Sequence, residues 1–143
     1  MAIKLDMTNA FDRVNHVFLF EIVLKMGFSK KNCKWIKACT NSPWIKPLVN
    51  GRPDGFFQAS RGLHQGCPLS PFLYLIVAES FTRKLQDMQT NGELRGLKIS
   101  KGVKNENHSQ FADDTILLGG ASVIIAEIFR KFISTFVKVQ TGK

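Results

Sequence analysis

The chain has 143 residues, of which 44% are hydrophobic and 22% are charged. This balance is typical of a globular domain and excludes a disordered chain, and the length suffices for one hydrophobic core. Twenty Lys and Arg residues against eleven Asp and Glu give a formal net charge of +9. Such an excess favours a polyanionic partner, nucleic acid ahead of an anionic membrane, with solubility alone as the plainer explanation.

The cysteines, histidines and apolar runs exclude further classes. Cys33, Cys39 and Cys67 match no zinc spacing and are expected to be free thiols in a reducing compartment. The three histidines form no HxxxH pair. No window reaches the roughly 18 continuous apolar residues that a membrane span needs, and no signal-peptide pattern opens the chain. We therefore expect an intracellular protein, in either the nucleus or the cytoplasm.

The first predicted elements are a strand and a helix. Residues 2–6 predict a buried strand that ends at Asp6. Apolar residues then recur at helical spacing, at Val14, Phe18, Ile22 and Met26. Gly27 is expected to end this helix, because glycine adopts the left-handed backbone conformation at little cost.

A second helix is predicted to begin at Ser29, whose hydroxyl can cap it. Its inward positions are Cys33, Ile36 and either Cys39 or Thr40. Four lysines face outward: Lys30, Lys31, Lys34 and Lys37. Such a face can meet phosphate groups, although a solvated surface is its commoner role.

A hairpin and a long helix follow. Pro43 stops the second helix, and two strands, 44–49 and 56–60, are expected around a turn at 50–55. Residues 61–71 then form a loop rich in glycine and proline.

Ser70 and Pro71 are a favourable helix start, and the helix is expected to run to about Met88. Apolar residues occur on more than one of its sides, which predicts deep burial. They are Phe72, Leu73, Ile76, Val77, Phe81, Leu85 and Met88.

The remaining elements are a short strand at 97–99, a hairpin around Asp113 and Asp114, a helix and a final strand at 137–139. The helix is expected to bury Ile124, Ile125, Ile128, Phe129, Phe132 and Phe136. This order predicts an α+β fold of the split βαβ kind, a mainly antiparallel sheet with helices packed on one face.

Two acidic sites suggest the chemistry. Asp113 and Asp114 lie between two apolar runs, and no glycine follows them as it does in turns that only reverse the chain. Adjacent carboxylates repel, which favours a shared cation and a third ligand. An isolated Asp-Asp pair is more often an ordinary polar turn. Asp6, at the end of the first strand, is the candidate third ligand of a Mg²⁺ site.

Three segments carry a family resemblance. They are KLDMTNAFDRV at 4–14, RGLHQGCPLSP at 61–71 and FADD at 111–114. In this order they resemble three motifs of the reverse transcriptase palm, of the type encoded by non-LTR (LINE-like) retrotransposons. Residues 49–51 and 56–61 also resemble the family, so the likeness covers nearly the whole chain.

The resemblance implies an RNA-directed DNA polymerase, in which a primer 3′-hydroxyl attacks the α-phosphate of a nucleotide between two metal ions. Asp6, Asp113 and Asp114 would be the catalytic residues and metal ligands, Asp114 in a looser role, and the backbone carbonyl of Met7 would add an oxygen. The implied cofactor is two Mg²⁺ ions, with Mn²⁺ as the alternative. The implied partners are an RNA template, a DNA primer and a dNTP, without a membrane; the oligomeric state stays open.

Further roles follow from the same resemblance. Phe11 would exclude a ribose 2′-hydroxyl by its bulk, although without the motif it reads as a core residue. Gln65 and Gly66 would lie against the nucleotide and the template base. Arg61 and Lys143 would contact phosphates, although Arg61 by itself suggests a surface ion pair.

The sequence also departs from the family. His64 and Cys67 stand where relatives often carry Arg and either Asp or Cys. Ser109 replaces an apolar residue in a strand expected to be buried. Asp12 is expected to be structural, either paired or capping a helix.

We expect residues 1–143 to form a single partial domain, the palm, without the N-terminal part of the fingers and without the thumb. Little would then hold template, primer and nucleotide in place, so the isolated fragment is expected to be inactive. One alternative is a non-catalytic retroelement remnant that binds nucleic acid through its basic surface. A nuclease using the same carboxylates is disfavoured because Phe11 and Gln65 suit nucleotide selection.

Overall fold

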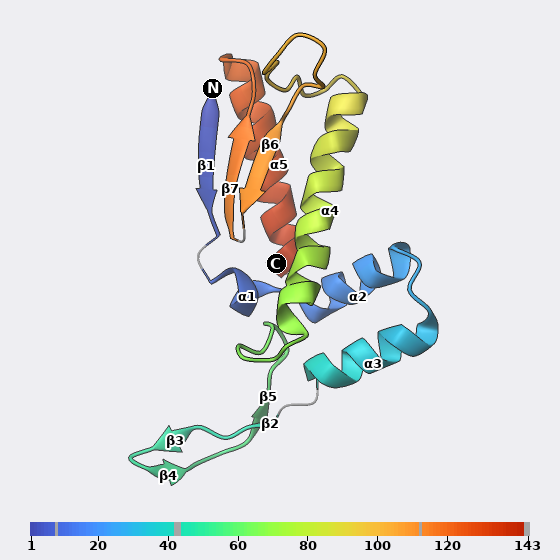
Figure 1. The fold of residues 1–143 in the computed structure, drawn as a ribbon. Helices are drawn as coiled ribbons and strands as arrows, with labels where there is room; N and C mark the ends of the chain where they lie inside the picture. Colours follow the sequence, from blue (N-terminus) through green and yellow to red (C-terminus); the bar gives the residue numbers. More distant parts are fainter. Residues whose placement is uncertain (8, 42–43, 112, 142–143) are drawn as a thin grey trace. The chain divides into compact units, whose positions relative to one another are not determined.

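The computed structural model describes residues 1–7, 9–41, 44–111 and 113–141. The chain divides into two compact units. The first comprises Met1–Ala10 and Ala78–Val139, and the second comprises Phe11–Val77 with the residues just after Val139. Helices and antiparallel strands both occur (Figure 1), which confirms the α+β class.

The first unit contains a three-stranded antiparallel sheet. Strand β7 (Asp114–Leu118) lies between β1 (Ala2–Asp6) and β6 (His108–Phe111). Side chains alternate between two faces along β7, where Thr115 and Leu117 are fully buried. One face of the sheet therefore packs on a core.

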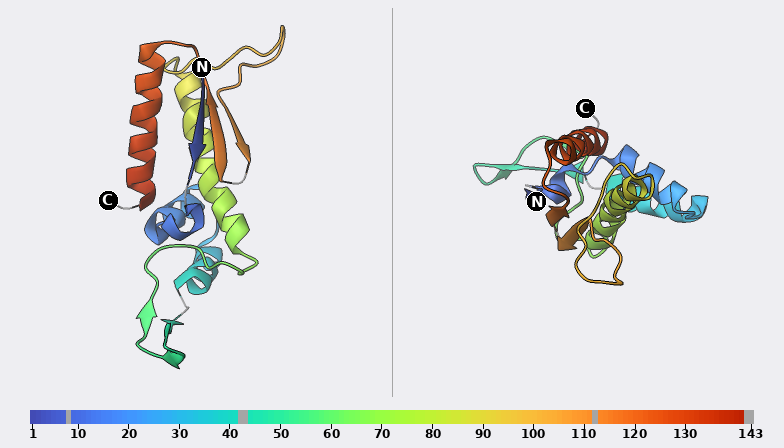
Figure 2. Two further views of the ribbon diagram at one scale, coloured as in Figure 1. Left: turned by 90° about the vertical axis from the view of Figure 1, so that its left-hand side faces the viewer. Right: turned by 90° about the horizontal axis from the view of Figure 1, so that it is seen from above.

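Two helices supply the rest of that core: the later part of α4 (Ser70–Thr90) and α5 (Val123–Thr141). Figures 1 and 2 show α5 alongside the sheet. The buried cluster contains Phe81, Leu85, Met88, Leu94, Leu117, Phe129 and Phe132. Because residues of α4 and α5 pack together on Leu117, both helices cover the same face of the sheet, as predicted.

The second unit begins with a chain of short helices. The sequence predicted one helix from Val14 to Met26, but the structure has α1 (Ala10–Arg13) and then α2 (His16–Lys25). Asn15 explains the break, because its Oδ1 accepts from the backbone N–H groups of Val17 at 2.8 Å and of Phe18 at 3.3 Å and so caps a new helix.

The next helix, α3 (Lys30–Asn41), follows the prediction closely. Gly27 has φ +86° after the end of α2, and the Ser29 hydroxyl accepts from Asn32 N at 3.2 Å. Cys33, Ile36 and Thr40 are the half-buried positions, whereas Cys39 is exposed.

The strands of the second unit are shorter than expected. Strand β2 (Trp44–Ile45) pairs with β5 (Phe57–Gln58), and β3 (Leu48–Val49) pairs with β4 (Arg52–Pro53). The turn is only Asn50-Gly51, with φ +51° and +76°. Asparagine and glycine both tolerate the left-handed conformation, so a two-residue turn replaces the predicted six-residue one.

Three predicted features near the chain's second half are wrong. The final strand predicted at 137–139 is instead part of α5. Two alternating valines are too short a pattern to distinguish a strand from a helix. Leu97 forms only an isolated bridge with Glu106. Phe72 and Ile124 are 65% and 72% exposed, because each lies on the outer side of its helix.

None of the helices in the described part of the chain is both long enough and apolar enough to cross a membrane.

Candidate active site

Two of the predicted metal ligands, Asp6 and Asp114, lie side by side at one end of the sheet of the first unit. Asp6 is the last residue of β1, Asp114 is the first residue of β7, and the antiparallel register pairs them directly. Cα atoms of such a pair lie about 4.5–5.5 Å apart. Asp113 precedes Asp114 in the exposed turn. The strand register therefore brings Asp6 opposite Asp114, one member of the late acidic pair, as predicted.

Hydrophobic patterning sets this register. Ile3 pairs with Leu117 and Leu5 with Thr115, and all four lie on the core side or in the core. At the far end of the pair, the Met1 ammonium group donates to the carbonyl of Gly119 at 2.8 Å. A one-residue slip would expose the apolar side chains, so packing on one face aligns carboxylates on the other.

A lysine that the sequence reasoning missed also belongs to this site. Lys4 Nζ lies 3.2 Å from Asp114 Oδ1, with the two side chains 65% and 49% exposed. Lys4 precedes Asp6 by two residues, so both side chains point to the same face of β1. Because side chains two residues apart on a strand share a face, this spacing could have predicted that Lys4 belongs to the site. The lysine offsets part of the negative charge of the three carboxylates.

The donor set suits a hard divalent cation. Within the described ranges, no group of three or more His, Cys, Asp or Glu side chains is arranged as a metal site. Magnesium, however, is usually held by one or two protein carboxylates together with waters and substrate phosphates. Asp6 and Asp114, paired beside Asp113, provide such carboxylates at an accessible edge. The Met7 side chain packs partly against the core.

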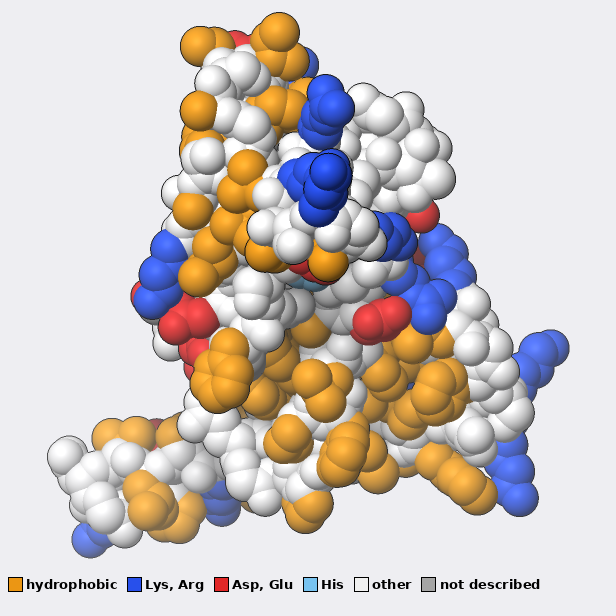
Figure 3. Space-filling model, turned by 45° about the horizontal axis from the view of Figure 1, so that its top comes forward, with side chains coloured by type: hydrophobic (Ala, Val, Ile, Leu, Met, Phe, Trp, Pro, Cys, Tyr) orange, Lys and Arg blue, Asp and Glu red, His pale blue; other side chains and the backbone are white. Residues whose placement is uncertain are grey.

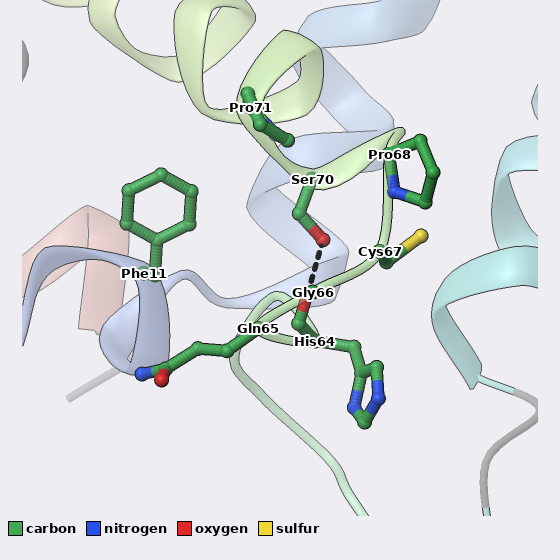
Figure 4. A pocket seen from close by; sticks show the side chains of 8 residues that line it. All are labelled: Phe11, His64, Gln65, Gly66, Cys67, Pro68, Ser70 and Pro71. Carbon is green, nitrogen blue, oxygen red and sulfur yellow. Dashed lines mark hydrogen bonds between the residues drawn. The ribbon is translucent and has the colours of Figure 1, made fainter.

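The second unit forms a separate pocket of about 520 Å³ (Figure 4). Its lining residues are Phe11, His64, Gln65, Gly66, Cys67, Pro68, Ser70 and Pro71. The Phe11 ring stacks on the buried Tyr74, with ring centroids 4.7 Å apart and an interplanar angle of 19°. The fold thus brings together Phe11, Gln65 and Gly66, the three residues predicted to bind a nucleotide.

Hydrogen bonds hold the glycine-rich loop against α1. Gly62 N donates to Val14 O at 2.8 Å, and Leu63 N donates to Phe11 O at 2.9 Å. Gly62 has φ +88°, and a Cβ there would lie 3.1 Å from the Asp12 carbonyl oxygen. Glycine is therefore needed both for the conformation and for the close approach.

Asp12 has the structural role that was predicted. Gln65 Nε2 donates to Asp12 Oδ1 at 3.3 Å, so the carboxylate is paired and fixes the loop. It does not cap the following helix, since Asn15 does.

Arg61 is exposed and lines a second cavity of about 300 Å³. Asp12, Thr40, His64 and Gln65 line the same cavity. Lys143, the other predicted phosphate contact, lies outside the described residues.

Strand β6 corrects one expectation. Ser109 is exposed and pairs with Ile116, because it lies on the sheet face opposite the core. Its neighbour His108 is half-buried, with Nε2 3.0 Å from Thr82 Oγ1 and Nδ1 2.6 Å from Asn107 Oδ1. Burial lowers the pKa of His108, and Glu106 opposes that shift.

Comparison with known proteins identifies the class. Residues 1–141 match the family model described as reverse transcriptase (RNA-dependent DNA polymerase). The chain therefore belongs to the reverse transcriptase family.

Its relatives point to retrotransposons. The chain is 41% identical over 68 residues to an uncharacterised mitochondrial protein of Arabidopsis thaliana, covering 48% of this chain and 56% of the relative. It is 30% identical to the uncharacterised 149 kDa protein of transposon TX1 from Xenopus laevis, over 81% of this chain and 8% of the relative. It is 28% identical to the Pol polyprotein of the type-1 retrotransposable element R2 from Popillia japonica, over 81% and 18% respectively.

These matches confirm the resemblance to reverse transcriptases of non-LTR retrotransposons. The chain spans about half of the first relative and less than a fifth of the other two. The reverse transcriptase family in general uses divalent metal ions.

Proposed function

We propose that this chain is the palm segment of an RNA-directed DNA polymerase from a non-LTR retroelement, which adds dNTPs to a primer 3′-hydroxyl on an RNA template. The observation that carries the proposal is the direct pairing of Asp6 with Asp114, next to Asp113, within motifs of the reverse transcriptase family. Positioning and neutralisation of charge supply most of the rate in phosphoryl transfer, so converging carboxylates are what such a site requires.

Asp6 and Asp113 would hold the metal ions, and Asp114 would complete the carboxylate cluster, with Lys4 offsetting part of its negative charge. The backbone carbonyl of Met7 would add an oxygen ligand. Two Mg²⁺ ions, or Mn²⁺ in their place, would stabilise the attacking and leaving oxygens.

The pocket of the second unit would select the nucleotide. Phe11 is fixed by its stack on Tyr74, so its ring presents a rigid wall that a 2′-hydroxyl would meet. Gln65 and Gly66 line the same pocket and would contact the nucleotide and template base. Arg61 would contact a phosphate, as Lys143 would.

The same segment is proposed to be a partial domain that needs more of its polypeptide for polymerisation. The much greater length of the retrotransposon relatives supports this view. The whole activity would require further elements that hold template and primer, and the isolated chain is expected to show little or none.

Metal binding by the isolated chain tests the site without requiring turnover. Electron paramagnetic resonance of Mn²⁺ should show binding to the wild-type chain and its loss, by about tenfold or more, in Asp6→Asn and Asp113→Asn, because each removes a charged oxygen ligand. Asp54→Asn and Asp87→Asn, which change exposed carboxylates elsewhere, serve as controls.

Equal binding by the variants and the wild type would refute the metal site. Nucleotide incorporation and strand cleavage should be assayed side by side, with the same variants. Metal-dependent cleavage without incorporation would favour a nuclease. Salt-sensitive nucleic-acid binding without metal binding would favour a non-catalytic remnant.

A further inference from the structure

Helix α3 presents a strongly basic surface that the proposed active site does not use. Lys30, Lys34 and Lys37 recur at i, i+4 and i+7, which places them within about 60° of one another around the helix. All three are exposed, and α3 contains no Asp or Glu. We call these three lysines the basic face of α3.

An exposed aromatic residue lies further round the same helix, next to Lys31. Trp35 is 59% exposed, and the Nζ atom of Lys31 lies 5.0 Å from its ring centroid. Lys37 Nζ lies 5.9 Å from the ring centroid of Phe20 in α2. The indole beside the Lys31 ammonium group offers a stacking surface next to cationic charge, the combination that binds single strands.

Charge within the second unit is concentrated rather than balanced. Residues 11–77 contain nine Lys and Arg but only three Asp and Glu, so this unit holds most of the chain's excess positive charge. Among the described residues, the two ion pairs are Lys4–Asp114 and Arg83–Glu79, and neither involves α3. Figure 3 shows Lys and Arg side chains projecting at the right-hand edge, the side on which Figure 1 draws α2 and α3.

Basic character continues beyond the helix. Thr40, near the end of α3, lines the 300 Å³ cavity together with Arg61.

We propose that the basic face of α3 binds the phosphate backbone of single-stranded nucleic acid, with an unpaired base stacked on Trp35. A membrane surface fits less well, because the apolar positions Cys33 and Ile36 point toward the protein and are half-buried. The inference is independent of the metal site, since no carboxylate of that site belongs to it.

Fluorescence anisotropy with a labelled single-stranded RNA of mixed sequence tests the proposal on the full chain. The triple variant Lys30→Gln, Lys34→Gln, Lys37→Gln should bind at least about tenfold more weakly at low salt, and its slope of log affinity against log salt should fall by about 2, because three phosphate contacts are lost. Trp35→Ala should weaken binding by about fivefold or more.

Matched controls separate this surface from general charge. Lys98→Gln, Lys101→Gln, Lys104→Gln removes the same charge at exposed positions of the first unit, and Trp44→Ala removes a comparably exposed indole of the second unit. Both should bind like the wild type.

Equal losses in the two triple variants would overturn the proposal, as would wild-type binding that does not depend on salt. Sedimentation with vesicles of phosphatidylserine and phosphatidylcholine tests whether the same surface binds a membrane instead. Vesicle binding that single-stranded RNA cannot displace would identify a membrane surface instead. Circular dichroism of each variant confirms that the helices are retained.

Discussion

The carboxylate end of the sheet and the glycine-rich pocket are assembled in different ways. In the first unit, β1 and β7 come from distant parts of the chain, and only the strand register aligns Asp6 with Asp114. In the second unit, backbone hydrogen bonds and the Asp12–Gln65 contact hold a loop against α1. The carboxylate site thus depends on a shared core, whereas the pocket depends on individual contacts.

The largest expected effect comes from the core beneath the carboxylates. Leu117 is fully buried and lies two residues after Thr115 on the same face of β7. Leu117→Ala should lower the free energy of unfolding by about 2–5 kcal/mol. Denaturant unfolding followed by far-ultraviolet circular dichroism measures the loss, and Mn²⁺ binding should weaken with it.

The exposed neighbour Ile116 gives the matched control. Ile116→Ala truncates an apolar side chain on the other face of β7, where 41% of its surface is exposed, and should cost clearly less. Both tryptophans, Trp35 and Trp44, lie in the second unit. If the tryptophan emission of Leu117→Ala changes at a lower denaturant concentration than that of the wild type, the second unit is destabilised together with the core of the first. That result would contradict the view that the pocket does not depend on this core.

The pocket should be broken instead by a backbone change. Gly62→Ala meets both a left-handed φ of +88° and the Asp12 carbonyl oxygen at 3.1 Å, and should cost about 1–3 kcal/mol of unfolding free energy. Gly66→Ala has a similar φ, +86°, but nothing within 4 Å of its Cβ. The difference between the two variants isolates the close approach. Equal losses would mean that the loop does not depend on contact with α1.

Acid should weaken the first unit through His108. Because burial lowers the pKa of His108, the unfolded chain binds the proton more readily than the folded one. Stability should therefore be complete above the unfolded pKa of 6.5 and decline as the pH falls below it. Unfolding midpoints at several pH values measure this dependence. His108→Gln, which does not titrate, should flatten it between pH 7 and 5; an unchanged profile would exclude His108 as the cause.

The spacing of apolar residues predicted which helix side chains form the core, but it did not predict where a side chain interrupts a helix by hydrogen bonding to the backbone. The apolar residues of α4 were predicted to be deeply buried, and Leu85 among them lies in the core. The burial of Leu117 was not predicted, because the hairpin around Asp113 and Asp114 was recognised without assigning its faces. The break at Asn15 was missed since its side chain competes with the helical backbone, a contact that apolar spacing cannot reveal.

The site shows the same division. Asp6, Asp113 and Asp114 were found from the adjacent acidic pair and the end of the first strand, and the family motifs then supported them; the structure pairs Asp6 with Asp114. Lys4 was missed because the motifs drew attention to acidic residues, although its place two residues before Asp6 put it on the same face. Ser109 was expected to be buried because sequence alone did not show which face of β6 meets the core.

The smallest effect on stability, and the most informative one for the carboxylates, is expected from Lys4. An exposed ion pair contributes about 0–1 kcal/mol, so Lys4→Met should scarcely change the unfolding midpoint. The same change removes the cation 3.2 Å from Asp114 and leaves the carboxylates more negative, so Mn²⁺ should bind several times more tightly. Lys84→Met removes an exposed charge on α4 and controls for net charge. Weaker binding in Lys4→Met alone would mean that the lysine orients Asp114 for the metal rather than competing with it.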